Sequence, residues 1–261
     1  MPIHLDAVTS RLEQAAFGKI AHDVMRCAFD IHNEFGRFFD EKIYKRELAR
    51  RIPQTVIEVP MQLTFETFSK LYYLDVLVAG SAVFEFKTVE ALVERHRSQL
   101  LHYLMMAELP HGKLINMRTE QVQHEFVNTQ LTRIDRTAFT VTLQAWQELS
   151  KPPIRAWFEA FLREVGTGLD NALYEEALTH LLGGEERVVQ EIEVTSENVS
   201  LGAQKFRLAA PQVALKVTAL SNPTPFEIHA RRLLKHTGLE AIQWINLTRN
   251  EVSFRTIQAG V

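Results

Sequence analysis

Hydrophobic positions in the first half of the chain follow helical spacing first and strand spacing afterwards. Apolar residues three and four positions apart between residues 20 and 35 predict a helix that ends before Gly36. A second short helix is expected over about residues 40–50, because Pro53 closes it. The denser apolar runs that follow predict three strands, a helix and a buried strand, at residues 55–63, 70–78, 82–88, 93–107 and 112–116.

The same plan returns in the second half of the chain. Residues that have an identical residue 130 positions later include Gly36, Asp40, Tyr44, Leu48, Leu109, Ile115, Asn116 and Val122. They fall in two distant windows at one constant offset, which predicts an internal duplication. Each half is therefore expected to run helix, three strands, helix, strand.

The segment between the two copies has a mixed pattern. Residues 139–143 alternate like a strand, and residues 144–149 have the pattern of a short helix. Pro152-Pro153 is the expected seam, since paired prolines interrupt regular structure. We therefore predict two domains, residues 1–150 and 151–261.

Charged side chains interrupt two predicted strands of the first half. Asp75 lies within the apolar run 71–78, and Glu85 and Lys87 lie within the run 82–87. An ionised carboxylate in such a strand costs on the order of several kcal/mol unless a partner or a metal compensates it. Alternate strand residues share a face, so Glu85 and Lys87 are expected to point the same way. Two carboxylates beside an ammonium can hold a divalent cation and activate a water, which is the chemistry of a metal-dependent phosphodiesterase.

Composition narrows the class of protein. With 261 residues, of which 46% are hydrophobic and 23% charged, the chain has the make-up of a globular protein with one or two cores. The first residues lack the pattern of a signal peptide, and no apolar run is long enough to span a membrane. Cys27 is the only cysteine, which excludes an intramolecular disulfide and a multi-cysteine metal site. We therefore expect a cytoplasmic protein without membrane contact.

Net charge gives no support to nucleic-acid binding. The value is −3, whereas non-specific nucleic-acid binders usually carry a basic excess. Local basic groups follow the third strand of each half: Arg95, His96, Arg97 and His102 in the first, and Arg231, Arg232 and Lys235 in the second. They are either phosphate-binding surfaces or solvated helix faces.

The order of the singled-out residues resembles a nuclease family. Glu41-x-x-Tyr44 after Gly36, Asp75, Glu85-x-Lys87 and Gln99-x-x-x-Tyr103 are together similar to the motifs of the GxxExxY family, within the PD-(D/E)XK nuclease superfamily. The resemblance covers about residues 15–127. It implies an α/β restriction-endonuclease-like fold, an α-β-β-β-α-β core in which helices flank a mixed sheet, and this fold is expected twice.

The resemblance implies a metal site. Asp75 and Glu85 would bind Mg²⁺ or Mn²⁺, with the backbone carbonyl of Phe86 as a third oxygen ligand. Glu41 would contribute through a water, and His32 matches a histidine that some relatives use as a ligand.

The resemblance also implies residues that act on the substrate. Lys87 would position or deprotonate the attacking water, or stabilise the negative charge that develops on phosphorus. Gln99 and Tyr103, one helical turn apart, would face the site from the following helix.

Structural roles are the alternative for each of these residues. Asp75 could be a satisfied carboxylate at a strand end, and Glu85 with Lys87 a same-face ion pair. Helix capping, packing or the helix dipole could explain the others, which are Glu41, Gln99, Tyr103 and His32.

The second half lacks the acidic residues at the matching positions. Alignment of the repeats sets Ala209, Leu215 and Val217 opposite the Asp75, Glu85 and Lys87 set, and Asn171 and His229 opposite Glu41 and Gln99. We expect a degenerate copy that serves as a scaffold, as a surface for a protein partner or a second copy of the chain, or as a nucleic-acid clamp.

Three functions remain open from the sequence. The favoured one is a Mg²⁺- or Mn²⁺-dependent nuclease whose first half cleaves phosphodiester bonds in DNA or RNA. The alternatives are a non-catalytic module that binds nucleic acid or protein, and a metal-dependent enzyme acting on a small phosphorylated substrate. The lack of a glycine-rich phosphate loop argues against a nucleotide triphosphatase.

Overall fold

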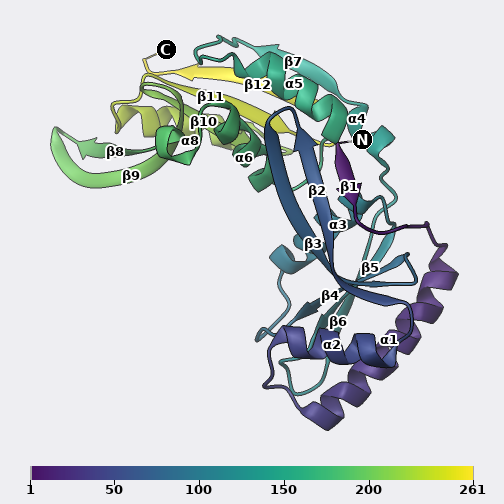
Figure 1. The fold of residues 1–261 in the computed structure, drawn as a ribbon. Helices are drawn as coiled ribbons and strands as arrows, with labels where there is room; N and C mark the ends of the chain where they lie inside the picture. The colour runs from purple at the N-terminus through teal and green to yellow at the C-terminus, as the bar shows by residue number, and fades with distance from the viewer. Residues whose placement is uncertain (1, 261) are drawn as a thin grey trace. The chain divides into compact units, whose positions relative to one another are not determined.

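The chain forms two compact units, Met1–Asp135 and Arg136–Val261. The structure is a computed structural model that describes residues 2–260. Each unit contains one six-stranded mixed sheet flanked by helices (Figure 1). The predicted α/β fold, present twice, is therefore confirmed. Across residues 2–260, no helix combines the length and the hydrophobicity that crossing a membrane requires.

The first sheet has the strand order β1-β2-β3-β4-β5-β6. All neighbours are antiparallel except β4 and β5, which run parallel because the helix α3 connects them. The predicted elements of this half are present, while β1 and β6 were not predicted. The elements are β1 (Ile3–Leu5), α1 (Gln14–Phe35), α2 (Glu41–Arg51), β2 (Thr55–Phe65), β3 (Phe68–Val78), β4 (Ala82–Lys87), α3 (Glu94–Ala107), β5 (His111–Asn116), β6 (Gln123–Asn128) and α4 (Arg133–Thr137), which spans the division between the units.

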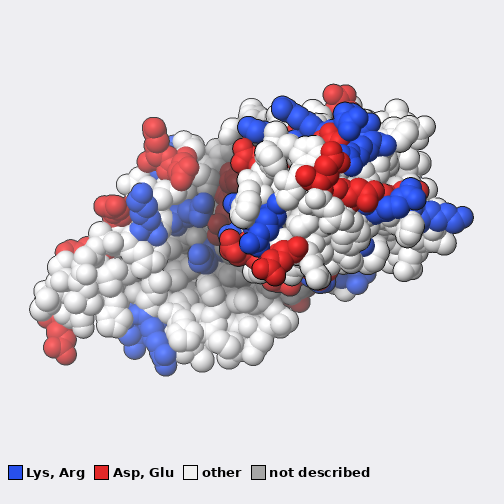
Figure 2. Space-filling view, turned by 90° about the horizontal axis from the view of Figure 1, so that it is seen from below, with Lys and Arg blue, Asp and Glu red and all other residues white. Residues whose placement is uncertain are grey.

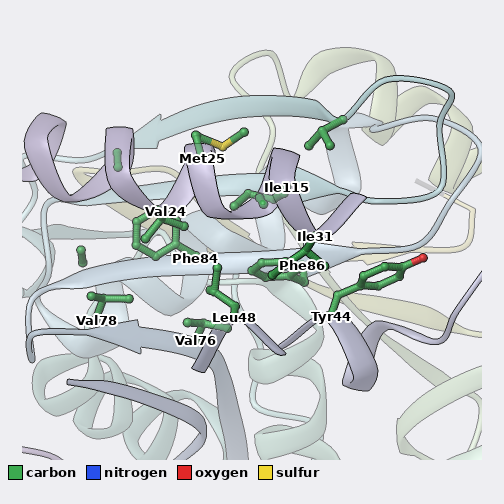
Figure 3. Close-up of a cluster of buried hydrophobic side chains, with 14 of the residues drawn as sticks. Val24, Met25, Ile31, Tyr44, Leu48, Val76, Val78, Phe84, Phe86 and Ile115 are labelled. Carbon is green, nitrogen blue, oxygen red and sulfur yellow. The ribbon is translucent and has the colours of Figure 1, made fainter. Parts of the chain in front are cut away.

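The core of the first unit determines which way the strand β4 faces. Val24 and Ile31 of α1 are fully buried in one cluster with Phe84 and Phe86 (Figure 3). Because strand side chains alternate, this packing directs Glu85 to the opposite face of the sheet. The apolar residues of β4 thus orient its acidic residue.

The second sheet repeats this arrangement over five strands. Its order is β8-β9-β10-β11-β12-β7, and β10 and β11 are the parallel pair that α8 connects. The sixth strand differs, because β7 joins beside β12 whereas β1 joins beside β2. The elements are β7 (Thr140–Gln144), α5 (Ile154–Val165), α6 (Asn171–Leu181), α7 (Glu185–Val188), β8 (Val189–Ser196), β9 (Val199–Ala210), β10 (Val213–Thr218), α8 (Thr224–Lys235), β11 (Ala241–Leu247) and β12 (Glu251–Gln258).

The turn between the first two helices is held in the same way in both units. The hydroxyl group of Tyr44 donates a hydrogen bond to the carbonyl of Gly36 at 2.8 Å. Tyr174 makes the same bond to Gly166, also at 2.8 Å. Each hydroxyl also accepts one backbone N–H of its own turn. The tyrosines and glycines that match between the two halves therefore hold the same turn in each unit.

The division between the units falls earlier than the seam expected at Pro152-Pro153. The linking segment belongs to the second sheet, because β7 pairs with β12. Arg136 is also 1% exposed and donates a hydrogen bond to the carbonyl of Val165 at 2.8 Å. Residues 136–150 therefore lie with the second unit.

The short helix expected over residues 144–149 is absent from this segment. The backbone N–H of Gln147 donates to the hydroxyl of Thr256, and its carbonyl accepts from the side chain of Gln243. Side chains of the sheet thus form hydrogen bonds with backbone groups that would be paired within the segment if it were a helix.

Candidate active site

Two carboxylates lie where the strands β3 and β4 separate. Ladder pairing of the two strands runs from Val78 and Ala82 to Val76 and Phe84 and then stops. Asp75 and Glu85 are the next residues on the two strands, and they are 8% and 1% exposed. Oδ2 of Asp75 accepts the backbone N–H of Phe86 at 3.0 Å, which ties the diverging strands together.

Glu85 has one paired and one unpaired carboxylate oxygen. Lys87 donates from Nζ to Oε1 of Glu85 at 2.7 Å, which places both side chains together as predicted. Oε2 is buried and has no hydrogen-bond partner within residues 2–260. Burial and the nearby charge of Asp75 raise the pKa of Glu85 to about 8, although Lys87 acts in the opposite direction. A buried carboxylate oxygen without a partner is costly, and this one is available to a cation.

Lys45 of α2 is a site residue that the sequence did not reveal. Its side chain is 5% exposed, and Nζ lies 2.9 Å from Oδ1 of Asp75 and 3.3 Å from Oε1 of Glu41. Nζ also contacts the carboxylate of Glu58 on β2. Burial disfavours the charged form of Lys45, but the hydrogen bonds to Glu58 and Asp75 outweigh it and raise its pKa. The only sequence signal was its position four residues after Glu41, on the same helix face.

Three carboxylates therefore converge on one cation, which in this structure is the ammonium group of Lys45. Burial, followed by the charge of Asp75, raises the pKa of Glu41. Within residues 2–260, no group of three or more His, Cys, Asp or Glu side chains is arranged to hold a metal ion. The donors present are all oxygen atoms, which suits a hard divalent cation such as Mg²⁺ or Mn²⁺. The carboxylates agree with such an ion in charge and in donor type, and Oε2 of Glu85 is buried without a hydrogen-bond partner among the described residues.

Gln99 and Tyr103 of α3 are brought together near these carboxylates. Nε2 of Gln99 donates to the hydroxyl group of Tyr103 at 3.1 Å, and the ring of Tyr103 contacts Tyr72 edge-on. Burial raises the pKa of Tyr103, and the charges of Glu85 and Asp75 act in the same direction. Tyr103 is therefore within electrostatic reach of the acidic site, and Gln99 is bonded to it.

His32 has a partner in the backbone of the first unit. It lies in the last turn of α1, and its Nε2 is 3.0 Å from the backbone carbonyl of Thr119. This contact does not test the ligand role that the resemblance implied, which stays a prediction.

The equivalent positions of the second unit follow from two matched asparagines. The amide of Asn116 bonds both the N–H and the carbonyl of Val89, and the amide of Asn246 does the same to Leu220. Across the parallel strands, Asn116 pairs with Lys87 and Asn246 pairs with Thr218. Thr218 therefore occupies the position of Lys87.

This register corrects the alignment made from the sequence, by one residue on β10 and by three residues on β9. Lys216, not Leu215, matches Glu85, and Phe206, not Ala209, matches Asp75, since the strand pairing is shifted by an irregularity between β9 and β10. Leu215 instead matches Phe84, on the face that α6 covers. The expectation that the second unit lacks carboxylates at these positions still holds.

Comparison with known proteins finds a similarity for the first unit. Residues 18–129 match the family model of the PD-(D/E)XK nuclease superfamily, which is less than half of the chain. The matched range contains each predicted site residue of the first unit. No curated protein and no solved structure gave a significant match. The first unit is therefore similar to PD-(D/E)XK nucleases, which generally use divalent metal ions.

Proposed function

We propose that the chain is a divalent-metal-dependent nuclease of the GxxExxY type, whose first unit hydrolyses phosphodiester bonds in nucleic acid. The observation that carries this proposal is the placement of Asp75 and Glu85 at the divergence of β3 and β4, with Lys87 beside Glu85. The superfamily match over residues 18–129 supports it independently.

Metal binding would use the carboxylates of the acidic site. Asp75 and Glu85 would hold the ion, Glu85 through its unpartnered Oε2, with the carbonyl of Phe86 and the carboxylate of Glu41 as further oxygen donors. A bound Mg²⁺ or Mn²⁺ supplies Lewis acidity toward the phosphate and lowers the pKa of a water. Lys45 would then give up its contacts, since its ammonium neutralises the same carboxylates.

Lys87 would act as a charge-stabilising group. Burial disfavours its ammonium form, but the contact with Glu85 outweighs this and raises the pKa of Lys87. A lysine that keeps its proton is suited to orienting the attacking water and to stabilising negative charge on phosphorus, and it is poorly suited to deprotonating the water.

Substrate binding would depend on local contacts. On the face shown in Figure 2, Lys and Arg alternate with Asp and Glu, without a continuous basic band. The net charge of −3 agrees with this mixed surface. Affinity for nucleic acid is therefore expected to come mainly from the metal site and to show a shallow dependence on salt.

Cleavage of labelled DNA and RNA, single- and double-stranded, tests the proposal. The wild type is expected to cleave at least one substrate with Mg²⁺ or Mn²⁺ and to stop in EDTA. Asp75→Asn and Lys87→Ala should each reduce the rate by about 10²-fold or more. Asp30→Asn and Lys19→Ala remove exposed charges of the same signs on α1 and should leave it unchanged. Cleavage that needs no metal, or that Lys87→Ala retains, would refute the proposal.

A non-catalytic interaction module is the second candidate. The observation that favours it is the second unit, which keeps the fold but has Phe206, Lys216 and Thr218 at the three positions of the acidic site. A wild type that binds the labelled nucleic acids with metal and never cleaves them would support this candidate over the nuclease.

A further inference from the structure

A cavity of about 250 Å³ lies in the second unit, at the position that corresponds to the acidic site of the first. Residues of β9, β10 and α8 line it, with Glu175 of α6 at its side. Its lining includes Phe206 and Lys216, the counterparts of Asp75 and Glu85 by strand register, and His229, which the sequence alignment sets opposite Gln99.

Aromatic and aliphatic side chains form the apolar part of the cavity. Phe206 and Phe226 line it together with Leu233 and Ile242. Phe226 is held in place by the buried ring of Trp244, whose centroid lies 4.3 Å from its own. The cavity therefore offers fixed aromatic surface to a flat, apolar group.

The polar part of the cavity carries positive charge. Lys205 and Lys216 line it, both are exposed, and within residues 2–260 neither forms an ion pair. Arg207 pairs with Glu175 at 3.0 Å, while its Nε is buried and makes no hydrogen bond among the described residues. Three cationic side chains thus face a single carboxylate, in a chain whose net charge is −3.

The substitutions between the two units reverse the sign of the site. An acidic site attracts a metal ion, which in turn binds phosphate. With Lys216 in place of Glu85, an ammonium group is available to bind phosphate directly, without a metal.

We propose that this cavity binds one nucleoside monophosphate unit, with the base against Phe206 and Phe226 and the phosphate on Lys205 and Lys216. Stacking of a base on an aromatic ring and charge-assisted bonds to its phosphate are the two contacts that such a ligand requires. The volume is just below the ~300–1,000 Å³ of small-molecule sites, which limits the occupant to a single unit. This site goes beyond the proposed nuclease activity and does not depend on it.

Calorimetric titration of the full chain in EDTA tests the proposal. The probes are AMP, GMP, CMP and UMP, with adenosine and inorganic phosphate as partial ligands. At least one monophosphate should bind, and adenosine or phosphate alone should bind at least tenfold more weakly. Lys216→Ala should weaken the best monophosphate by about tenfold, whereas Lys235→Ala, an exposed lysine of α8 outside the cavity, should stay within twofold.

A second titration determines whether the bound unit is a free nucleotide or the end of a nucleic-acid strand. A 5′-phosphorylated trinucleotide that binds at least tenfold more tightly than the monophosphate, in a Lys216-dependent way, identifies the end of a strand. Equal or weaker binding of the trinucleotide identifies a free nucleotide. Asp75→Asn should bind like the wild type, so this result is independent of nuclease activity.

Two results would overturn the proposal. One is that no monophosphate binds to the folded wild type at millimolar concentration. The other is that Lys216→Ala and Phe226→Leu, shown to be folded by their unfolding transitions, both bind with unchanged affinity.

Discussion

Lys45 shows how one side chain can balance the charge of an entire acidic site. Its ammonium contacts Asp75, which is buried, Glu41, which is partly exposed, and Glu58, which is exposed. Without such a counter-charge, these carboxylates would repel one another at short range. Lys45 is therefore expected to stabilise the protein when no metal is bound.

Replacement of Lys45 by methionine tests this role. Lys45→Met should lower the free energy of unfolding by about 3 kcal/mol in EDTA, because it leaves buried negative charges uncompensated. Mg²⁺ should restore more stability to the variant than to the wild type, since the ion supplies the missing charge. Thermal unfolding with and without Mg²⁺ measures both effects, with Lys42→Met, an exposed lysine of the same helix, as the control. Equal responses of Lys45→Met and the control to Mg²⁺ would contradict the role.

Glu85 predicts a particular dependence of stability on pH. Burial raises its pKa from 4.5 to about 8, so the folded state keeps a proton that the unfolded state has released. The stabilisation is complete below pH 4.5 and is lost as pH rises through about 8. In EDTA, denaturant titrations between these limits should show stability falling with pH in the wild type.

Glu85→Gln is the matched variant for this pH dependence. It keeps the shape of the side chain and does not titrate, so its stability curve should be flatter over the same range. Mg²⁺ should also flatten the wild-type curve, because a bound cation favours the ionised carboxylate. A wild-type curve in EDTA as flat as that of Glu85→Gln would contradict the assigned pKa.

At the scale of elements, the turn between the first two helices of each unit depends on one tyrosine hydroxyl. Tyr174 is fully buried and bonds Gly166 and the N–H of Leu169. Removal of the hydroxyl leaves two backbone groups without that partner, a loss of about 1–3 kcal/mol per buried group. The turn sets the direction in which the second helix leaves.

Tyr174→Phe and Tyr44→Phe separate the contributions of the two turns. Tyr174→Phe should lower the free energy of unfolding by about 2 kcal/mol and leave cleavage by the first unit unchanged. Tyr44→Phe should lose similar stability and also reduce cleavage, because Tyr44 directly precedes Lys45 at the acidic site. Denaturant unfolding and the cleavage assay give the two readouts, and loss of cleavage in Tyr174→Phe alone would contradict this assignment.

At the scale of the whole molecule, the division at residue 135 assigns the linking segment to the second unit. The strand β7 completes the second sheet, and the carbonyl of Arg136 accepts hydrogen bonds from both the N–H and the hydroxyl of Thr167. A second unit that began at Pro152-Pro153 would lack both the strand β7 and the hydrogen bonds to Arg136.

Two fragments of different length test the division. Residues 136–261 should unfold cooperatively on their own, whereas residues 151–261 should be less stable by several kcal/mol, on the order of what the loss of an edge strand and of buried hydrogen bonds costs. Circular dichroism during thermal unfolding compares them. Equal stability of the two fragments would instead favour the boundary at the prolines.

Several features could be predicted because they depend on local spacing. The stripe on α1, the three strands after it and the same-face placement of Glu85 and Lys87 follow from periods of 3.6 and 2 residues. The repeat was visible for a related reason, since Tyr44 and Asn116 make hydrogen bonds to the backbone that recur in each copy. The short edge strand β1 carries little pattern over three residues, and it was not predicted.

The sequence by itself determined the α/β fold of both halves and the candidate acidic site, because apolar periodicity and charges inside a strand are properties of consecutive residues. Only the tertiary structure showed Lys45 among the carboxylates, the one-residue shift that puts Lys216 opposite Glu85, and β7 in the second sheet. Each of these depends on which strands and helices meet across long stretches of chain. These contacts are determined by packing and strand register, which cannot be predicted from a local pattern of residues.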